Sequence, residues 1–304
     1  MKSIIFFGSS DFSKTVLEIL LKDFKIEAVI TETDKPKGRS LTLSPNPVAT
    51  FANNANLKII KSPKINSDKE KLEKLPCDFF VVAAFGQIIS DDILKMPRSE
   101  SLNLHPSLLP KYRGPSPIQQ TLLNEDKVTG NSVIKITSKL DSGPIFKQSK
   151  IEISSDDNYT TLSHKLAVDG GKLLKEVMQD FEKLKPLLQN EKMASRTSII
   201  SKNDGLINWN EKAHLINAKI KAFANWPTCF TNMDNLKLII KKAEMSNIPS
   251  NKPGQITIKC NEIFVSASDY YLRILLIQPS GRKEMDHAAF ANGYKRLDGK
   301  ILNV

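Results

Sequence analysis

Short apolar runs alternate with amphipathic stretches over the first half of the chain. Residues 79–84 (FFVVAA) contain no polar position, as expected for a strand that is covered on both faces. Apolar runs predict further strands at residues 3–7, 26–30, 57–60 and 101–105. After the first of them, Ser9, Ser10 and Asp11 offer caps for a helix with apolar residues at helical spacing. Strands that alternate with helices predict an α/β fold with a Rossmann-like, doubly wound and mostly parallel sheet.

The pattern changes towards the C-terminus. Residues 131–136 and 146–153 are predicted strands, and residues 160–183 form a helix with one apolar face. A polar stretch follows, and then a helix at 212–222 and short strands at 236–242, 254–259, 263–266 and 271–278. Short strands in series favour a small β-barrel, OB-like in type. We therefore predict a catalytic domain at 1–188, a linker at 189–204 and a β-barrel domain at 205–304.

Between residues 31 and 48 lies a long polar segment, TETDKPKGRSLTLSPNPV, with three prolines. Loops of this length inside a compact domain are usually functional or disordered. The segment concentrates basic side chains, because Lys35, Lys37 and Arg39 lie within five positions. It is a candidate contact surface for an anionic partner.

Composition excludes several classes of protein. No apolar run approaches the roughly 20 residues of a membrane helix. The three cysteines are scattered and lack C-x-x-C spacing, so neither a zinc site nor a disulfide framework is predicted, and a reducing cytoplasm is the expected location. The net charge is +11, and residues 201–304 carry over half of it. Such a balance suits binding of a polyanion, although a lysine-rich solvated surface explains it equally well.

Candidate chemistry gathers where a predicted strand ends. Asn103 and His105 lie two positions apart and so share one face of the strand, and Pro106 stops it. Ligands of doubly wound sheets bind outside such strand ends. Acyl transfer to an amine needs donors for an oxyanion and a group that takes a proton, which Asn103 and His105 offer, and Asp141 could orient the histidine. Taken alone, a structural histidine and a turn-forming aspartate explain these residues as well.

A two-part motif narrows the choice. The segment NLHPSLLPKYRG, followed by LDSGPI, resembles the 10-formyltetrahydrofolate-dependent formyltransferases. The resemblance implies an N-terminal Rossmann-like domain, a folate formyl donor and no metal. It places the catalytic residues of the family on Asn103, His105 and Asp141. It also implies two folate-contacting segments, which are Ser107, Leu108, Leu109 and Pro110, and, after Ala84, the residues Phe85, Gly86, Gln87 and Ile88.

Nearly the whole chain resembles the branch of the family that formylates methionyl-initiator tRNA. The opening F-x-G-S-x-D-F, the R-G-x-x-P-I-Q after the catalytic strand, and D-G-x-I-x-W with F-x-x-W-P near residue 205 carry this resemblance. It implies that the C-terminal barrel helps to hold tRNA and that the loop residues Lys35, Lys37, Arg39 and Leu41 contact it. Pro106 and the absence of a lysine pair after Gly38-Arg39 depart from the pattern of that branch. Leu41 as an apolar wedge at the acceptor stem is a hypothesis.

Other functions stay open on the residues alone. Sugar-nucleotide formylation would use the same first domain and a similar barrel. Nicotinamide-dependent oxidoreduction is disfavoured, because FFGSS has one glycine where G-x-G-x-x-G is needed. A non-catalytic RNA-binding module would leave Asn103, His105 and Asp141 without a role. We expect a monomer with no obligate protein partner and no contact with a membrane.

Overall fold

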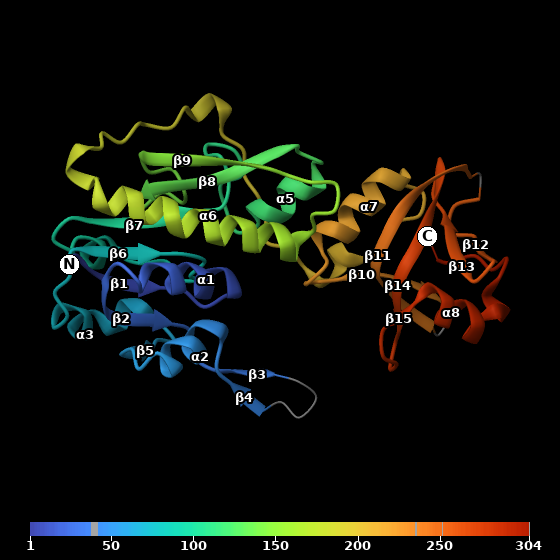
Figure 1. Cartoon of the computed structure of the whole chain (residues 1–304), viewed down its shortest axis with the longest axis horizontal. Helices are drawn as coiled ribbons and strands as arrows, with labels where there is room; N and C mark the ends of the chain where they lie inside the picture. The colour runs from blue at the N-terminus through green and yellow to red at the C-terminus, as the bar shows by residue number, and fades with distance from the viewer. Residues whose placement is uncertain (38–41, 235, 251, 304) are drawn as a thin grey trace. The chain divides into compact units, whose positions relative to one another are not determined.

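The computed structural model describes residues 1–37, 42–234, 236–250 and 252–303, and the chain forms two compact units. The first comprises Met1–Pro117, Val128–Ile153 and Ser163–Thr197, and the second Ile118–Lys127, Ser154–Leu162 and Ser198–Val304. Each unit contains its own large sheet (Figure 1). The domain boundaries inferred from the sequence stay a prediction.

The first unit is built on a seven-stranded sheet of order β5-β2-β1-β6-β7-β8-β9. The first five strands of this order are parallel, and β8 and β9 are antiparallel additions at one edge. This arrangement confirms the predicted mostly parallel α/β sheet. In chain order the strands are β1 (Ser3–Phe7), β2 (Lys25–Thr31), β5 (Ile59–Lys61), β6 (Phe79–Val82), β7 (Glu100–His105), β8 (Val128–Lys135) and β9 (Ile145–Glu152).

Helices cover both faces of this sheet (Figure 1). On one face, Phe80 packs with side chains from the segments of η1 (Ile65–Asp68), α3 (Lys69–Glu73) and α4 (Asp91–Leu94). On the other face α1 and α6 pack so closely that a Cβ at Gly171 would meet the side chain of Ile19 at 2.8 Å. The predicted cap of α1 is confirmed, since the side chain of Ser10 accepts a hydrogen bond from the Ser13 amide. The helices here are α1 (Asp11–Leu20), α2 (Pro47–Asn54) and α6 (Tyr159–Gln179).

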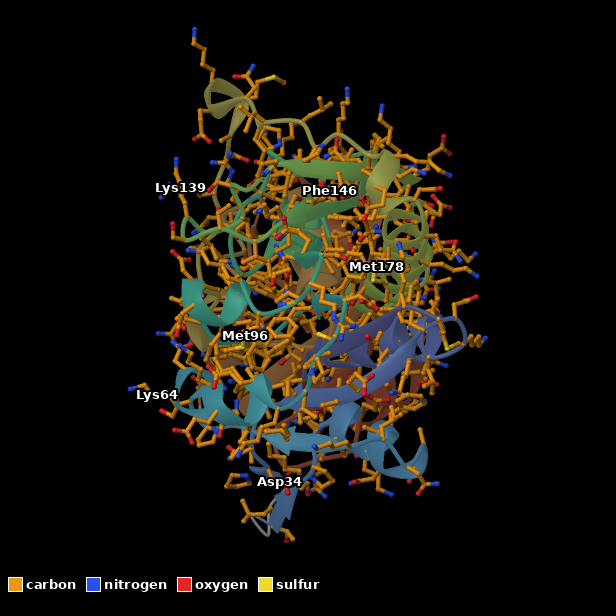
Figure 2. All side chains as sticks on the ribbon, turned by 90° about the vertical axis from the view of Figure 1, so that its left-hand side faces the viewer. Asp34, Lys64, Met96, Lys139, Phe146 and Met178 are labelled. Carbon is orange, nitrogen blue, oxygen red and sulfur yellow. The ribbon has the colours of Figure 1, made fainter. Side chains whose placement is uncertain are left out.

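The polar segment before α2 contains a hairpin rather than only a loop. Strands β3 (Lys35–Lys37) and β4 (Thr42–Ser44) pair antiparallel. Asp34 lies at the base of this hairpin (Figure 2), and its carboxylate is 2.7 Å from Nζ of Lys61 at the end of β5. Lys35 is exposed and contacts Glu32 at 2.6 Å. The predicted contacts Arg39 and Leu41 lie outside the described residues.

The second unit holds an antiparallel sheet of order β10-β11-β14-β13-β12, with β15 paired to β14. Its strands are β10 (Cys229–Met233), β11 (Leu236–Pro249), β12 (Ile256–Lys259), β13 (Glu262–Ser266), β14 (Tyr270–Pro279) and β15 (Met285–Asp286), and its helices include α5 (Pro117–Leu123), α7 (Ala213–Ala222) and α8 (His287–Gly293). Trp209, which is fully buried, fixes the segment before α7 to the sheet, because its Nε1 donates a 3.0 Å hydrogen bond to the hydroxyl of Thr231 in β10. The sheet agrees with the predicted series of strands, and its closure into a barrel stays a prediction.

No helix in the described part of the chain is long and apolar enough to cross a membrane.

Candidate active site

The end of β7 brings two of the predicted catalytic side chains together. Asn103 pairs with Val82 of the neighbouring strand β6, whose side chain belongs to the core on the α3 and α4 side of the sheet. Leu104 points to the opposite face, where it packs against Gly170 of α6. Because side chains alternate along a strand, Asn103 and His105 face the same side.

The third predicted residue, Asp141, reaches them from the loop between β8 and β9. The chain folds back so tightly there that a Cβ at Gly143 would lie 1.8 Å from the carbonyl oxygen of Lys135. Asp141 itself has a φ of +48°, in the left-handed region. Its carboxylate accepts a 2.8 Å hydrogen bond from the Gly114 amide and a long one of 3.4 Å from Nδ2 of Asn103.

The environment of His105 distinguishes its two ring nitrogens. The residue is 4% exposed, and Nε2 lies 2.9 Å from the carbonyl oxygen of Tyr112. Since a carbonyl can only accept, Nε2 carries the hydrogen of this bond. Nδ1 lies 3.6 Å from the carboxylate of Asp141. In this tautomer Nδ1 carries the lone pair of the ring, on the side of the Asp141 carboxylate.

A cavity of about 170 Å³ opens beside Asn103 and Asp141. Phe85, Gln87 and Ile88 line it, and their contact with folate stays a prediction. Gln87 also anchors the segment, because its amide bonds the Ile65 amide at 2.7 Å and the Ser62 carbonyl at 2.8 Å. Gly86 is exposed and faces Glu32 instead. The cavity therefore combines apolar side chains with several polar ones, which suits a flat heterocycle with an attached reactive group.

The second predicted folate segment is a buried turn. The hydroxyl of Ser107 donates to the carbonyl of Lys111 at 2.7 Å, and the amide of Leu109 donates to Ser132 at 3.0 Å. Leu108 packs near Gly130 of β8, and the Leu109-Pro110 peptide bond is cis. None of these four residues lines the cavity. Their contact with folate stays a prediction.

A buried arginine lies behind the site, and the sequence reasoning did not assign it a role. Arg113 is 2% exposed, and its guanidinium binds the side chains of Gln189 and Glu191. Hydrogen bonds from Arg113 and then from Lys139 lower the pKa of Glu191 to about 2, so this carboxylate is charged at neutral pH. Lys139 projects at the edge of the molecule (Figure 2). Gln189 and Glu191 fall in the predicted linker, and the signal that could have found them is the need of a buried guanidinium for an acceptor.

Comparison with known proteins agrees with this geometry. The chain matches the formyl transferase family over residues 1–178 and the formyl transferase C-terminal domain over residues 199–295. The fold and the site thus define a formyltransferase. The chain is 38% identical in sequence to a methionyl-tRNA formyltransferase from a Hydrogenobaculum species. The alignment covers 96% of this chain and 97% of that protein. The chain belongs to the methionyl-tRNA formyltransferase family.

Solved structures show the same fold at lower identity. An N-formyltransferase from Helicobacter canadensis, in complex with folinic acid and dTDP-3-aminofucose, superposes with a TM-score of 0.68 at 20% identity. It covers 94% of this chain and all of its own. A methionyl-tRNA formyltransferase from Clostridium thermocellum gives a TM-score of 0.57 at 16% identity, over 81% of this chain and 95% of its own.

Proposed function

We propose that this protein transfers the formyl group of 10-formyltetrahydrofolate to the α-amino group of methionyl-initiator tRNA. The observation that carries the proposal is that Asn103 and Asp141 line the cavity beside β7, while His105 lies behind them with Nδ1 3.6 Å from the carboxylate of Asp141. The similarity to methionyl-tRNA formyltransferases over nearly the whole chain selects the acceptor. The sugar-nucleotide enzyme is related at 20% identity, a level that supports the shared fold alone.

Each of the three side chains has a role in this reaction. The amine attacks the formyl carbon, and the carbonyl oxygen gains negative charge. Asn103 donates one amide hydrogen to Asp141, and its second amide hydrogen can stabilise the negatively charged oxygen. Nδ1 of His105 takes the proton that the amine loses and can return it to the departing nitrogen of the folate. Asp141 stabilises the imidazolium between these two transfers.

The cavity has features that suit the folate donor. Ile88 and Leu140 line it although they are 85% and 66% exposed. Large apolar side chains left open at a cavity gain free energy when a ligand covers them. Phe85 adds an aromatic face at the same place. If the pterin ring of the folate is bound here, the formyl-bearing nitrogen of the folate would lie near Asn103 and Asp141.

The test of the function is a transfer assay with 10-formyltetrahydrofolate and methionyl-initiator tRNA. Uncharged initiator tRNA, glycinamide ribonucleotide and a UDP-amino sugar serve as alternative acceptors. We expect product on the charged tRNA alone. Transfer to the sugar nucleotide without transfer to the tRNA would overturn the acceptor. Folate binding without transfer to any acceptor would overturn the reaction.

We infer that a cavity in the second unit contacts the tRNA backbone. It measures about 420 Å³, and three lysines (Lys221, Lys241 and Lys242) and two carboxylates (Asp156 and Glu244) line it together with Asn217. Asn217 is 9% exposed, and within the described residues its Oδ1 has no hydrogen-bond partner. Lys241 falls at an irregularity in the pairing of β11 with β14, which changes the direction of side chains locally. The cavity has no aromatic lining residue, so it suits a phosphate and its ribose better than a stacked base.

Removing two of these positive charges should weaken tRNA binding and make the binding constant less dependent on salt. The double variant Lys241→Ala with Lys242→Ala is expected to reduce the slope of log K against log salt by about 1.5, because each lost phosphate contact removes roughly 0.7 to 0.9. The kcat at saturating tRNA should stay unchanged. Binding measured from low to high salt checks this. The double variant Lys259→Ala with Lys300→Ala loses the same charge from exposed positions, and an equal loss of slope there would argue against a local contact.

We further propose that the protein works as a monomer in the cytoplasm. Two of its three free cysteines, Cys77 and Cys229, are buried, and burial raises the pKa of each thiol to about 12. Such thiols are inert towards disulfide exchange, which agrees with a reducing compartment. Light scattering coupled to gel filtration would test the monomer.

A further inference from the structure

The structure connects two loops of the site, the one after β7 and the one between β8 and β9, to residues 189–197, which we call the strap. Arg113, eight positions after His105, makes its side-chain hydrogen bonds to the strap. Its Nε and Nη2 reach Oε1 of Gln189 at 2.9 and 2.8 Å, and its Nη1 and Nη2 reach the carboxylate of Glu191 at 3.1 and 2.9 Å. The backbone of Arg113 also pairs with Ser195 and Thr197. A buried, fixed guanidinium thus holds the strap by its side chains and its main chain.

This contact determines the orientation of the Gln189 amide. A guanidinium has only donors, so the oxygen of the amide must face Arg113. Nε2 then points the other way, where it donates to the carbonyl oxygens of Asp141 and Gly143, both at 2.8 Å. A side chain from the strap therefore hydrogen-bonds the main chain of the loop between β8 and β9, on either side of Ser142.

Asp141 needs such support. Its φ of +48° lies in the left-handed region, which few L-residues other than Asn and Asp adopt, so its neighbours determine where its carboxylate points. Its carbonyl is held by Gln189, and its carboxylate is held by the amide of Gly114, the residue after Arg113. Both ends of Asp141 thus depend on one assembly. A small rotation about this residue would move the carboxylate away from Nδ1 of His105, now 3.6 Å distant.

We propose that Gln189 is a positioning residue for the formyl transfer, locked in orientation by Arg113 and Glu191, and that it acts by holding Asp141 against His105. The inference rests on the proposed function, because it concerns the same site. Gln189 itself does not line the cavity, and it reaches the site only through the main chain of Asp141 and of Gly143, which does line it.

The variant Gln189→Glu separates this role from a structural one. A glutamate keeps an oxygen for Arg113, and its second oxygen replaces the donor to the two carbonyls by an acceptor. The kcat for formylation is expected to fall about 10- to 100-fold, the cost of a small misplacement of a catalytic group. The KM for tRNA and the KM for the folate should stay close to those of the wild type. Gln278→Glu is the matched control, since Gln278 also donates to a main-chain carbonyl, that of Arg282, and should keep the wild-type kcat.

A double-mutant cycle with Asp141→Asn decides the route. If Gln189 acts through Asp141, adding Gln189→Glu to Asp141→Asn lowers kcat little further. An unchanged kcat in Gln189→Glu, or an equal fold loss in both backgrounds, would overturn the proposal. The wild-type assay keeps this result separate from the proposed function. If the wild type formylates methionyl-tRNA but the losses in the cycle are additive, the proposed function stands and only the role of Gln189 is overturned.

Discussion

Asn103→Ala is expected to lower the kcat of formylation by about 100- to 1000-fold, the usual effect of removing one preset donor to an oxyanion. The physical reason is that its amide lies on the cavity side of the sheet, where one hydrogen bonds Asp141 at 3.4 Å and the other is left for the substrate. Steady-state kinetics at saturating concentrations of both substrates would measure the loss.

Binding of tRNA should change little in the same variant, because the proposed contacts of the nucleic acid lie on other elements. Asn53→Ala serves as a control, since Asn53 is exposed on α2 and does not line the cavity. We expect that variant to keep kcat within about threefold of the wild type, as surface substitutions usually have small effects. Equal losses of turnover and tRNA affinity in Asn103→Ala would refute the assigned role.

The second large effect is expected for Asp141→Asn, which should reduce kcat by about 100- to 10,000-fold, as removal of the carboxylate behind a catalytic histidine does elsewhere. The substitution changes the charge more than the shape. An asparagine oxygen can still accept from the Gly114 amide, now 2.8 Å from the carboxylate, so the loop should keep its conformation. What is lost is the negative charge beside Nδ1 of His105, together with the weak acceptor for Nδ2 of Asn103.

Comparison with His105→Ala tests this explanation. If Asp141 acts on the histidine, the combined variant should be no slower than His105→Ala alone, since residues that act as a unit are not additive. Asp91→Asn removes an exposed carboxylate at the start of α4 and should leave the rate unchanged. A further loss of the same size in the combined variant would show that Asp141 acts on the substrate independently.

The sheet of the first unit was predictable because its strands are apolar without interruption. The continuous run of β6 and the cap at Ser10 predicted the elements within a few residues. Strand β11 was predicted too short, since Lys241 and Lys242 looked like a strand end, whereas one face of β11 is open to solvent and accepts charge. The hairpin β3–β4 was missed because its strands have three residues each and no apolar alternation.

The site was predicted only where its residues are close in sequence or carried by a motif. Asn103 and His105 share a strand face, which periodicity alone indicates. Asp141, 38 positions from Asn103, was a candidate on its chemistry, and only the resemblance assigned it to the same site, because no local pattern encodes its approach. The contacts of Gln189 could not be foreseen, since a polar stretch without periodicity looks like a linker whether or not it packs against a buried group.

The separation in sequence of Arg113 and the strap has a consequence for biosynthesis. Between them the chain crosses into the second unit twice, at residues 118–127 and 154–162, before Glu191 arrives 78 positions after Arg113. A nascent chain that ends at residue 178, where the match to the formyl transferase family ends, already holds every strand of the first sheet. It still lacks the acceptors for its buried guanidinium and the amide that holds Asp141. On the ribosome, the loop that carries Asp141 therefore reaches its final geometry only after the strap has left the exit tunnel. The active site is thus completed late in synthesis.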